Sequence, residues 1–140
     1  MTQEQRVFNV LKRAEASITE ITGQPCYLML DKHPVYVNIL FTEALYNTSL
    51  LLDIDTRLIL GDGQTKELSN ARKMIVAAMR EFSDISYPAL ATKLNKENHT
   101  TIVSAYKKHK QHLECEFDYR YKYEQLLNNL TPTLRKYGKR

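Results

Sequence analysis

The stretch over residues 95–108 constrains the fold most strongly, because a polar run leads directly into an apolar helical repeat. The polar run consists of Asn98, His99, Thr100 and Thr101. The apolar residues that follow share one helical face and are Ile102, Val103 and Tyr106. A helix of this kind packs through its body on a small domain, while its opening turn can contact the edges of base pairs. The pattern therefore predicts a helix that fits a groove of duplex DNA.

A short helix is predicted immediately upstream, over residues 86–94. Ser86 can cap it, and Pro88 in its first turn removes no helical hydrogen bond. Residues 95–97 form a tight connection, and Ala91 leaves room for the two helices to approach closely. Two short helices joined in this way form a helix-turn-helix. Tandem apolar helices are also common in domains that bind no DNA, so the spacing alone leaves both possibilities open.

The rest of the chain is predicted to be mainly α, with helices over residues 2–22, 42–52, 67–82, 98–115 and 118–130. Thr42 is the expected N-cap of the second of these, and Pro132 is expected to end the last. Residues 26–30 and 35–41 are rich in β-formers and predict a short hairpin, although Pro34 could equally begin a helix. Residues 131–140 form a basic tail.

The composition excludes several classes of protein. A hydrophobic content of 43% in 140 residues suffices for the core of one domain. No apolar run is long enough to cross a bilayer, and the amphipathic N-terminus with its acidic residues does not resemble a secretory signal. Cys26 and Cys115 lack CxxC spacing and are expected to be reduced thiols. The expected location is the cytoplasm, in association with the nucleoid.

Positive charge is concentrated in the second half of the chain. Residues 1–61 contain five Lys or Arg and seven Asp or Glu, which gives −2. Residues 62–140 contain fifteen and nine, which gives +6, and the two halves sum to the whole-chain +4. A polyanion is a suitable partner for the second half. An ordinary solvated surface could carry the same charge, so charge alone does not identify nucleic acid as that partner.

Several segments resemble, at matching spacing, the C-terminal DNA-binding domain of the bacterial replication initiator DnaA. They are residues 71–75 (ARKMI), 86–90 (SYPAL), 98–103 (NHTTIV) and 107–108 (KK), with weaker likeness at 53–60 and 66–68. The resemblance extends over about residues 42–130 and implies a Trp-repressor-like helix-turn-helix bundle that binds double-stranded DNA. Residues 1–41 carry no recognisable motif and are treated as an N-terminal module of unknown role.

The resemblance also implies DNA-contacting roles for particular residues. Base edges would be contacted by Asn98, His99 and Thr100, with Thr101 facing bases or backbone. A helix N-terminus that holds phosphate would be formed by Ser86, Tyr87 and Pro88. Salt-sensitive attraction would come from Lys66, Lys93, Lys96, Lys107 and Lys108. The simpler alternatives are that Asn98 only caps its helix, that His99 is solvated or packed, and that the lysines form a solvated face.

Three residues differ from the family's pattern. Glu97 replaces an arginine and places a negative charge beside the phosphate backbone. Asn98 replaces an aspartate, an exchange that suits adenine in place of cytosine. Gln64, beside Asp62, occupies the position from which the family inserts an arginine into the minor groove. We therefore expect the recognised site to differ from the initiator's usual box, or the affinity to be lower.

An enzymatic role has little support in the sequence. The ATPase motif GxxxxGK[ST] of the initiator is absent, so neither a nucleotide cofactor nor ATP-driven origin opening by this chain alone is expected. A divalent metal could be held by Glu43, Asp53, Asp55 and Asp62, but helix caps and loop acids explain these better. Zinc could be held by His109, His112 and Cys115, but a solvated helix end explains them better. No metal and no catalytic residue is expected.

An interaction adaptor is the main alternative to a DNA-binding protein. A decayed DNA surface would leave a fold that binds a protein partner through residues 1–41, or through the run of Tyr119, Tyr121 and Tyr123. Tyrosine is common at interfaces, but tyrosines that cover the edge of a core give the same pattern. The oligomeric state does not follow from the sequence. The preferred interpretation is duplex DNA binding, in replication or transcription control.

Overall fold

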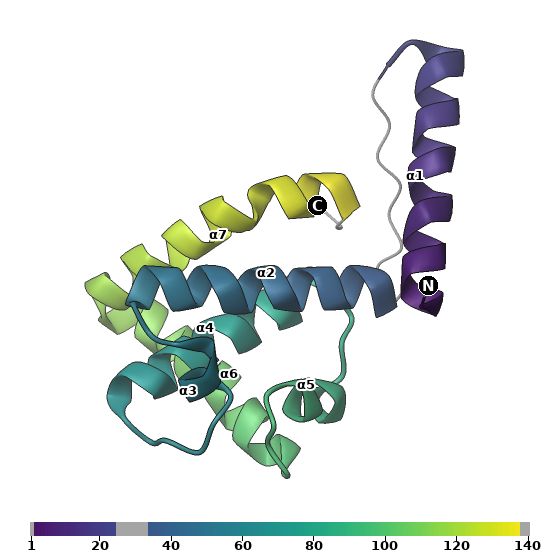
Figure 1. Cartoon of the computed structure of the whole chain (residues 1–140). Helices are drawn as coiled ribbons and strands as arrows, with labels where there is room; N and C mark the ends of the chain where they lie inside the picture. The colour runs from purple at the N-terminus through teal and green to yellow at the C-terminus, as the bar shows by residue number, and fades with distance from the viewer. Residues whose placement is uncertain (1, 25–33, 138–140) are drawn as a thin grey trace.

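Helices form all the regular elements in the described residues, 2–24 and 34–137, of this computed structural model (Figure 1). In chain order they are α1 (Gln3–Thr22), α2 (Pro34–Leu52), α3 (Thr56–Ile59), α4 (Lys66–Phe82), α5 (Tyr87–Lys93), α6 (His99–Cys115) and α7 (Phe117–Tyr137). This arrangement confirms the predicted mainly α fold with a helix-turn-helix, which α5 and α6 form.

Helix α4 is the centre of the core. Nine of its 17 residues are buried, and α2, α6 and α7 all pack on it. It begins at Lys66, because the Thr65 hydroxyl accepts a hydrogen bond from the Leu68 amide at 3.2 Å and caps the helix. A helix with a long buried face can position the segments that pack on it, and the predicted DNA-contacting helix α6 is one of these.

The predicted hairpin is wrong where the structure can test it. Residues 35–41 lie within α2, which begins at Pro34 as the alternative interpretation allowed. The other expected strand, residues 26–30, lies outside the described residues. Helix α2 packs against α4 and α7, and its buried residues include Tyr36, Leu40 and Phe41. A helix packed on more than one side is apolar nearly all round, so it lacks the helical period that separates it from a buried strand.

Two expected helix boundaries are also wrong. Thr42 lies in the interior of α2 and caps nothing, because the helix starts at Pro34. Pro132 lies inside α7, which continues to Tyr137 and takes in much of the expected basic tail. A proline in a helix loses one hydrogen bond. Leu130 is fully buried and Leu134 also packs on the core, so burial on both sides of Pro132 offsets that loss.

Helix α1 has the predicted bounds and extends away from the rest of the molecule (Figure 1). Thr2 and Gln5 cap it reciprocally, and Gly23 ends it in the left-handed region at φ 73°, where its N–H donates to the Thr19 carbonyl at 2.8 Å. Its packing contacts within the described residues are mainly with α2. The expected boundary at residues 41–42 falls within α2, which is continuous there.

Candidate nucleic-acid interface

The turn between α5 and α6 is short and is held by backbone hydrogen bonds to α5. Asn95 adopts a left-handed conformation with φ 57°, which asparagine tolerates better than most residues. The Lys96 amide then donates to the Ala91 carbonyl at 2.8 Å, and the Leu94 amide donates to Leu90 at 3.0 Å. Four residues are buried where α5 and α6 meet: Leu90, Ala91, Leu94 and Ile102. The turn therefore fixes the angle at which α6 leaves the domain.

The opening turn of α6 is accessible to a partner. Asn98 caps the helix, because its side-chain oxygen accepts a hydrogen bond from the Thr100 amide at 2.8 Å. Its neighbours in the polar run are all solvent-exposed, as Asn98 is itself: His99, Thr100 and Thr101. Ile102, the next residue, is only 3% exposed. Helix α6 therefore packs on the domain from Ile102 onward, and the polar run before Ile102 lies in solvent.

A groove of about 700 Å³ lies beside this turn, between α6, α4 and the loop before α4. Its lining includes Gln64, Arg72, Lys73, Asn98, Thr101 and Lys108. Thr100 also lines the groove, whereas His99 is exposed outside it. The groove therefore joins two segments that the resemblance assigns to different contacts with DNA, the opening turn of α6 and the loop that carries Gln64.

Arg72 on α4 holds the loop that forms one wall of the groove. Its guanidinium donates to the carbonyls of Ile59 at 2.8 Å, Gly61 at 2.8 Å and Gly63 at 2.6 Å. Burial lowers the pKa of Arg72 below its ordinary value. Sequence analysis missed this role, because the partners are backbone carbonyls that leave no trace in residue identity. An arginine at a fixed distance after a glycine-containing loop is the only signal that could have indicated it.

Positive charge is concentrated near the groove by three lysines, Lys66, Lys73 and Lys108. Burial lowers the pKa of Lys73, and the neighbouring charges of Lys108 and Lys66 lower it further. Such mutual repulsion among ammonium groups is relieved when an anion binds beside them. Lys66, Lys107 and Lys108 are exposed, as a phosphate contact requires. Lys73, which is not in the predicted set, is instead buried on α4, with its ammonium 3.3 Å from the His112 ring nitrogen Nδ1.

Comparison with known families assigns this part of the chain. The family model described as bacterial dnaA protein helix-turn-helix matches residues 47–108. Residues 47–108 are therefore similar in sequence to the DnaA helix-turn-helix family. The matched segment is a type of DNA-binding domain and extends from α2 through α3, α4 and α5 into α6. A search of curated proteins found no match to the chain.

Two lysines of the predicted set have their ammonium groups bound within this DnaA-type domain, although Lys96 also lines the groove. The Lys93 ammonium is hydrogen-bonded to the Asn38 side chain on α2 and lies 5.4 Å from the centre of the Phe41 ring. The Lys96 ammonium donates to the Gly61 carbonyl at 2.7 Å and helps Arg72 to hold the loop. Burial, and after it the charge of Arg72, lowers the pKa of Lys96. Both lysines therefore hold parts of the DnaA-type domain in place. A count of charges in the sequence cannot distinguish a lysine with this role from a lysine that contacts DNA.

The first turn of α5 has the predicted geometry at Ser86. Its hydroxyl accepts a hydrogen bond from the Ala89 amide at 3.3 Å, and Pro88 occupies the first turn of the helix. Ser86 and Pro88 are exposed, whereas Tyr87 is half-buried beneath the guanidinium of Arg80, which lies 4.1 Å from the ring centre. The N-terminal end of α5 in the DnaA-type domain is therefore accessible, and its aromatic ring serves the packing of α4 against α5.

The proposed metal-binding alternatives gain no support from the structure. No group of three His, Cys, Asp or Glu side chains within the described part of the chain could hold a metal ion. Asp55 caps α3 and pairs with Arg57 at 3.1 Å, which fits the simpler explanation. Cys115 is exposed, but His109 is fully buried, so the expected solvated helix end is wrong for that residue. His109 bonds to the Tyr119 hydroxyl at 2.6 Å.

The tyrosines of α7 divide between the core and solvent. Tyr119 and Tyr123 are each 3% exposed and surround His109, whereas Tyr121 is 53% exposed. The spacing of four residues places the first two on one helical face. The tyrosine run as a whole is therefore not a surface stripe, which removes one of the two surfaces that the adaptor hypothesis offered.

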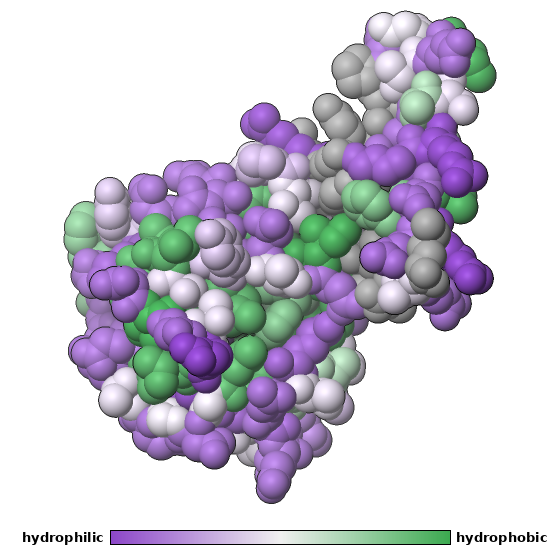
Figure 2. Space-filling view, viewed as in Figure 1, coloured by the Kyte–Doolittle hydropathy of each residue, from purple (hydrophilic) through white to green (hydrophobic). Residues whose placement is uncertain are grey.

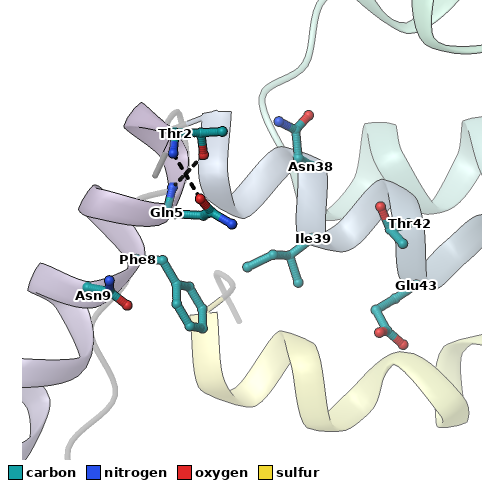
Figure 3. A pocket seen from close by; sticks show the side chains of 8 residues that line it. All are labelled: Thr2, Gln5, Phe8, Asn9, Asn38, Ile39, Thr42 and Glu43. Atoms are coloured by element: carbon teal, nitrogen blue, oxygen red, sulfur yellow. Dashed lines mark hydrogen bonds between the residues drawn. The ribbon is translucent and has the colours of Figure 1, made fainter.

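Two other surfaces lie apart from the groove. A hollow of about 500 Å³ separates the N-terminal part of α1 from α2, where Phe8 and Ile39 point toward each other (Figure 3). Figure 2 shows apolar side chains gathered over α2 and α3, where Leu50 is 61% and Leu58 57% exposed. Across residues 2–24 and 34–137, no helix has the length and apolar character needed to cross a membrane. Neither surface brings together groups with binding chemistry comparable to that of the groove.

Proposed function

We propose that this protein binds duplex DNA in a sequence-dependent manner, with the opening turn of α6 in the major groove. The observation that carries the proposal is the exposure of Asn98, His99, Thr100 and Thr101 beside a groove, within a segment of the DnaA family. Small polar side chains suit this position, because they reach base edges without a long flexible stem and the threonine methyl can contact thymine.

The phosphate backbone is held on either side of this turn in the proposed complex. Lys66, Lys107 and Lys108 are exposed cations that attract phosphate without regard to sequence. At the N-terminal end of α5 the Tyr87 amide can donate a hydrogen bond to a phosphate oxygen, since Pro88 has no N–H and the Ala89 amide is bonded to the Ser86 hydroxyl. The loop with Gln64 approaches the neighbouring minor groove, where a neutral amide attracts phosphate less strongly than an arginine would.

The proposal extends to the biological setting. The protein acts without catalytic activity, in replication or transcription control, and associates with the nucleoid in the cytoplasm. The DNA-binding unit begins at Pro34, because α2 is continuous from there and Tyr36, Leu40 and Phe41 are buried in the core. Residues before Pro34, including α1, form a separate module that could bind a protein partner.

An interaction adaptor remains the second candidate, and acidic residues favour it. Glu97 and Asp62 both line the groove, where they would repel a phosphate backbone. Under this alternative the apolar surface around Leu50 and Leu58 would bind protein. The two candidates differ in one measurable property, since only the DNA-binding protein has an affinity for duplex DNA that falls steeply as salt increases.

A salt titration of binding to mixed-sequence duplex DNA tests the proposal. Lys108→Ala should weaken binding to every duplex and reduce the slope of log K against log salt by about one, since it removes one phosphate contact. Arg135→Ala is the matched control, because it removes the same charge from an exposed position near the end of α7, away from α6 (Figure 1). It should leave the slope unchanged. No salt-dependent binding by the unaltered protein would overturn the proposal.

A further inference from the structure

The loop between α3 and α4, residues 60–65, is held by side chains from two neighbouring segments. The Gly61 carbonyl accepts hydrogen bonds from the Arg72 guanidinium at 2.8 Å and from the Lys96 ammonium at 2.7 Å. The Asn95 side-chain amide donates to the Leu60 carbonyl at 3.3 Å. Arg72 lies on α4, whereas Asn95 and Lys96 lie in the turn between α5 and α6. These three side chains, named here the loop clamp, therefore bond the loop to α4 on one side and to that turn on the other.

The loop clamp connects the two segments that would contact adjacent grooves of DNA. Gln64 comes three residues after the carbonyl of Gly61, and Asn98 comes two residues after Lys96. Gln64 and Asn98 are exposed, and both line the groove. The separation between Gln64 and the polar run of α6 is therefore set by the hydrogen bonds of the clamp, together with the packing of α6 on α4.

The two cations of the clamp direct their donors into the protein. Burial lowers the pKa of Arg72 and of Lys96, which fits ammonium and guanidinium groups that bond to carbonyls more than to water. A charged donor forms a stronger hydrogen bond with a carbonyl than a neutral donor does. A phosphate contact by Lys96 would have to compete with its bond to Gly61, whereas Lys107 is fully available on the exposed surface of α6.

We propose that the loop clamp determines sequence specificity by holding Gln64 and the polar run of α6 at one fixed separation. The protein then reads a major groove and the neighbouring minor groove as a single site of fixed spacing, and Lys96 is a positioning residue in place of a phosphate contact. This inference rests on the proposed function. Two contacts that are held in advance lose little conformational freedom on binding. A released loop would have to be ordered by the DNA and could accept several spacings, which weakens discrimination between sites more than attraction to phosphate.

The same exchange at two lysines tests the proposal. The measurement is the affinity for a duplex that wild type selects from a random pool and for a scrambled duplex, over a series of salt concentrations. Lys96→Met removes the ammonium from the clamp and should lower the ratio of the two affinities about tenfold, with the slope of log K against log salt nearly unchanged. Lys107→Met removes an exposed ammonium from α6 and is the matched control. It should lower the slope by about one on both duplexes and leave the ratio unchanged.

A neutral exchange in the clamp provides a second test. Asn95→Gly removes the bond to the Leu60 carbonyl without changing any charge, and glycine adopts the φ of 57° at this position without strain. It should lower the affinity ratio in the same direction as Lys96→Met, by about threefold. Lys96→Arg is the conservative variant and should retain most of the wild-type ratio, because a guanidinium can donate to the same carbonyl. In the free protein, amide hydrogen exchange over residues 61–64 should be faster in Lys96→Met and Asn95→Gly than in wild type.

The outcomes separate this inference from the proposed function. If Lys96→Met lowers the slope by about one and keeps the wild-type ratio, Lys96 contacts phosphate, so the inference is wrong and the proposed function survives. A wild-type ratio in Asn95→Gly would overturn the inference in the same way. If wild type shows no salt-dependent duplex binding, both fall together. Thermal unfolding of each variant accompanies the binding measurements, and if Lys96→Met does not unfold cooperatively, the result for Asn95→Gly decides.

Discussion

At the scale of single residues, burial changes what a polar side chain does. His109 is fully enclosed by α6 and α7, where Tyr119 and Tyr123 contact its ring. Burial lowers the pKa of His109 to about 4, and the positive charges of His112, Lys110 and Lys73 act in the same direction. The spacing of three residues between His109, His112 and Cys115 would suit a metal site, but His109 is a neutral side chain in the core.

The lowered pKa of His109 predicts that acid destabilises the fold. Above pH 6.5 the imidazole is neutral in both the folded and the unfolded chain and contributes no pH dependence. Between pH 6.5 and about 4 the unfolded chain binds a proton that the folded chain does not, so the free energy of unfolding falls as pH falls. At pH 5 this loss is about 2 kcal/mol.

Urea unfolding of wild type and His109→Gln at pH 7 and pH 5 measures this effect. Glutamine can keep the contact with the Tyr119 hydroxyl, but it does not titrate, so its loss on acidification should be smaller by about 2 kcal/mol. Equal losses for the two proteins would show that His109 does not stay neutral in the folded state.

At the scale of elements, the sequence located the helices that have one exposed face and misassigned part of a helix that has little exposed surface. Helices α1, α4 and α6 each have one exposed face, and the resulting apolar period located all three. Helix α2 has no such period, because its packing against α4 and α7 leaves little exposed surface, and part of it was mistaken for a strand. The exposed turn of α6 was predictable because its polar residues are consecutive, whereas the contacts of Arg72 and Lys96 depend on backbone carbonyls that no sequence pattern reports.

The tight packing of α2 leads to a prediction at Thr48. This residue is fully buried, and its hydroxyl oxygen has no hydrogen-bond partner among the described residues. A buried hydroxyl without a partner costs stability, and valine has the same shape without that group. Thr48→Val should therefore stabilise the fold by about 1 kcal/mol and raise the melting temperature by a few degrees.

Thr42 on the same helix provides the control for Thr48. It is exposed, so Thr42→Val removes a hydroxyl that water already satisfies and should change the melting temperature by no more than about 1–2 °C. A lower melting temperature for Thr48→Val than for wild type would mean that the hydroxyl contributes a favourable interaction.

At the scale of the whole molecule, the DnaA-type bundle and α1 differ in how they are held. Helices α2, α4 and α7 contact one another around a shared core and α6 packs on α4 and α7, whereas α1 contacts mainly α2 (Figure 1). The exposed turn of α6 belongs to the bundle, so DNA binding should not depend on α1. The division of the chain expected from sequence placed the boundary inside α2, because the apolar residues before Thr42 could not be assigned to the core without the structure.

A chain that begins at Pro34 tests this independence. We expect it to unfold cooperatively, with a melting temperature within about 5 °C of the full chain, since the bundle keeps nearly all of its buried core. Its affinity for duplex DNA should match that of the full chain under the same salt conditions. Loss of cooperative unfolding would show that the residues before Pro34 are part of the same folding unit.

The central claim is that the opening turn of α6 distinguishes one DNA sequence from another. The most direct measurement is the affinity of wild type and Thr100→Ala for a selected duplex and for a scrambled duplex at one salt concentration. Thr100→Ala should lose about 1–3 kcal/mol on the selected duplex and almost nothing on the scrambled one, since base contacts specify and phosphate contacts do not. Equal losses on both duplexes, or no loss on either, would contradict the claim.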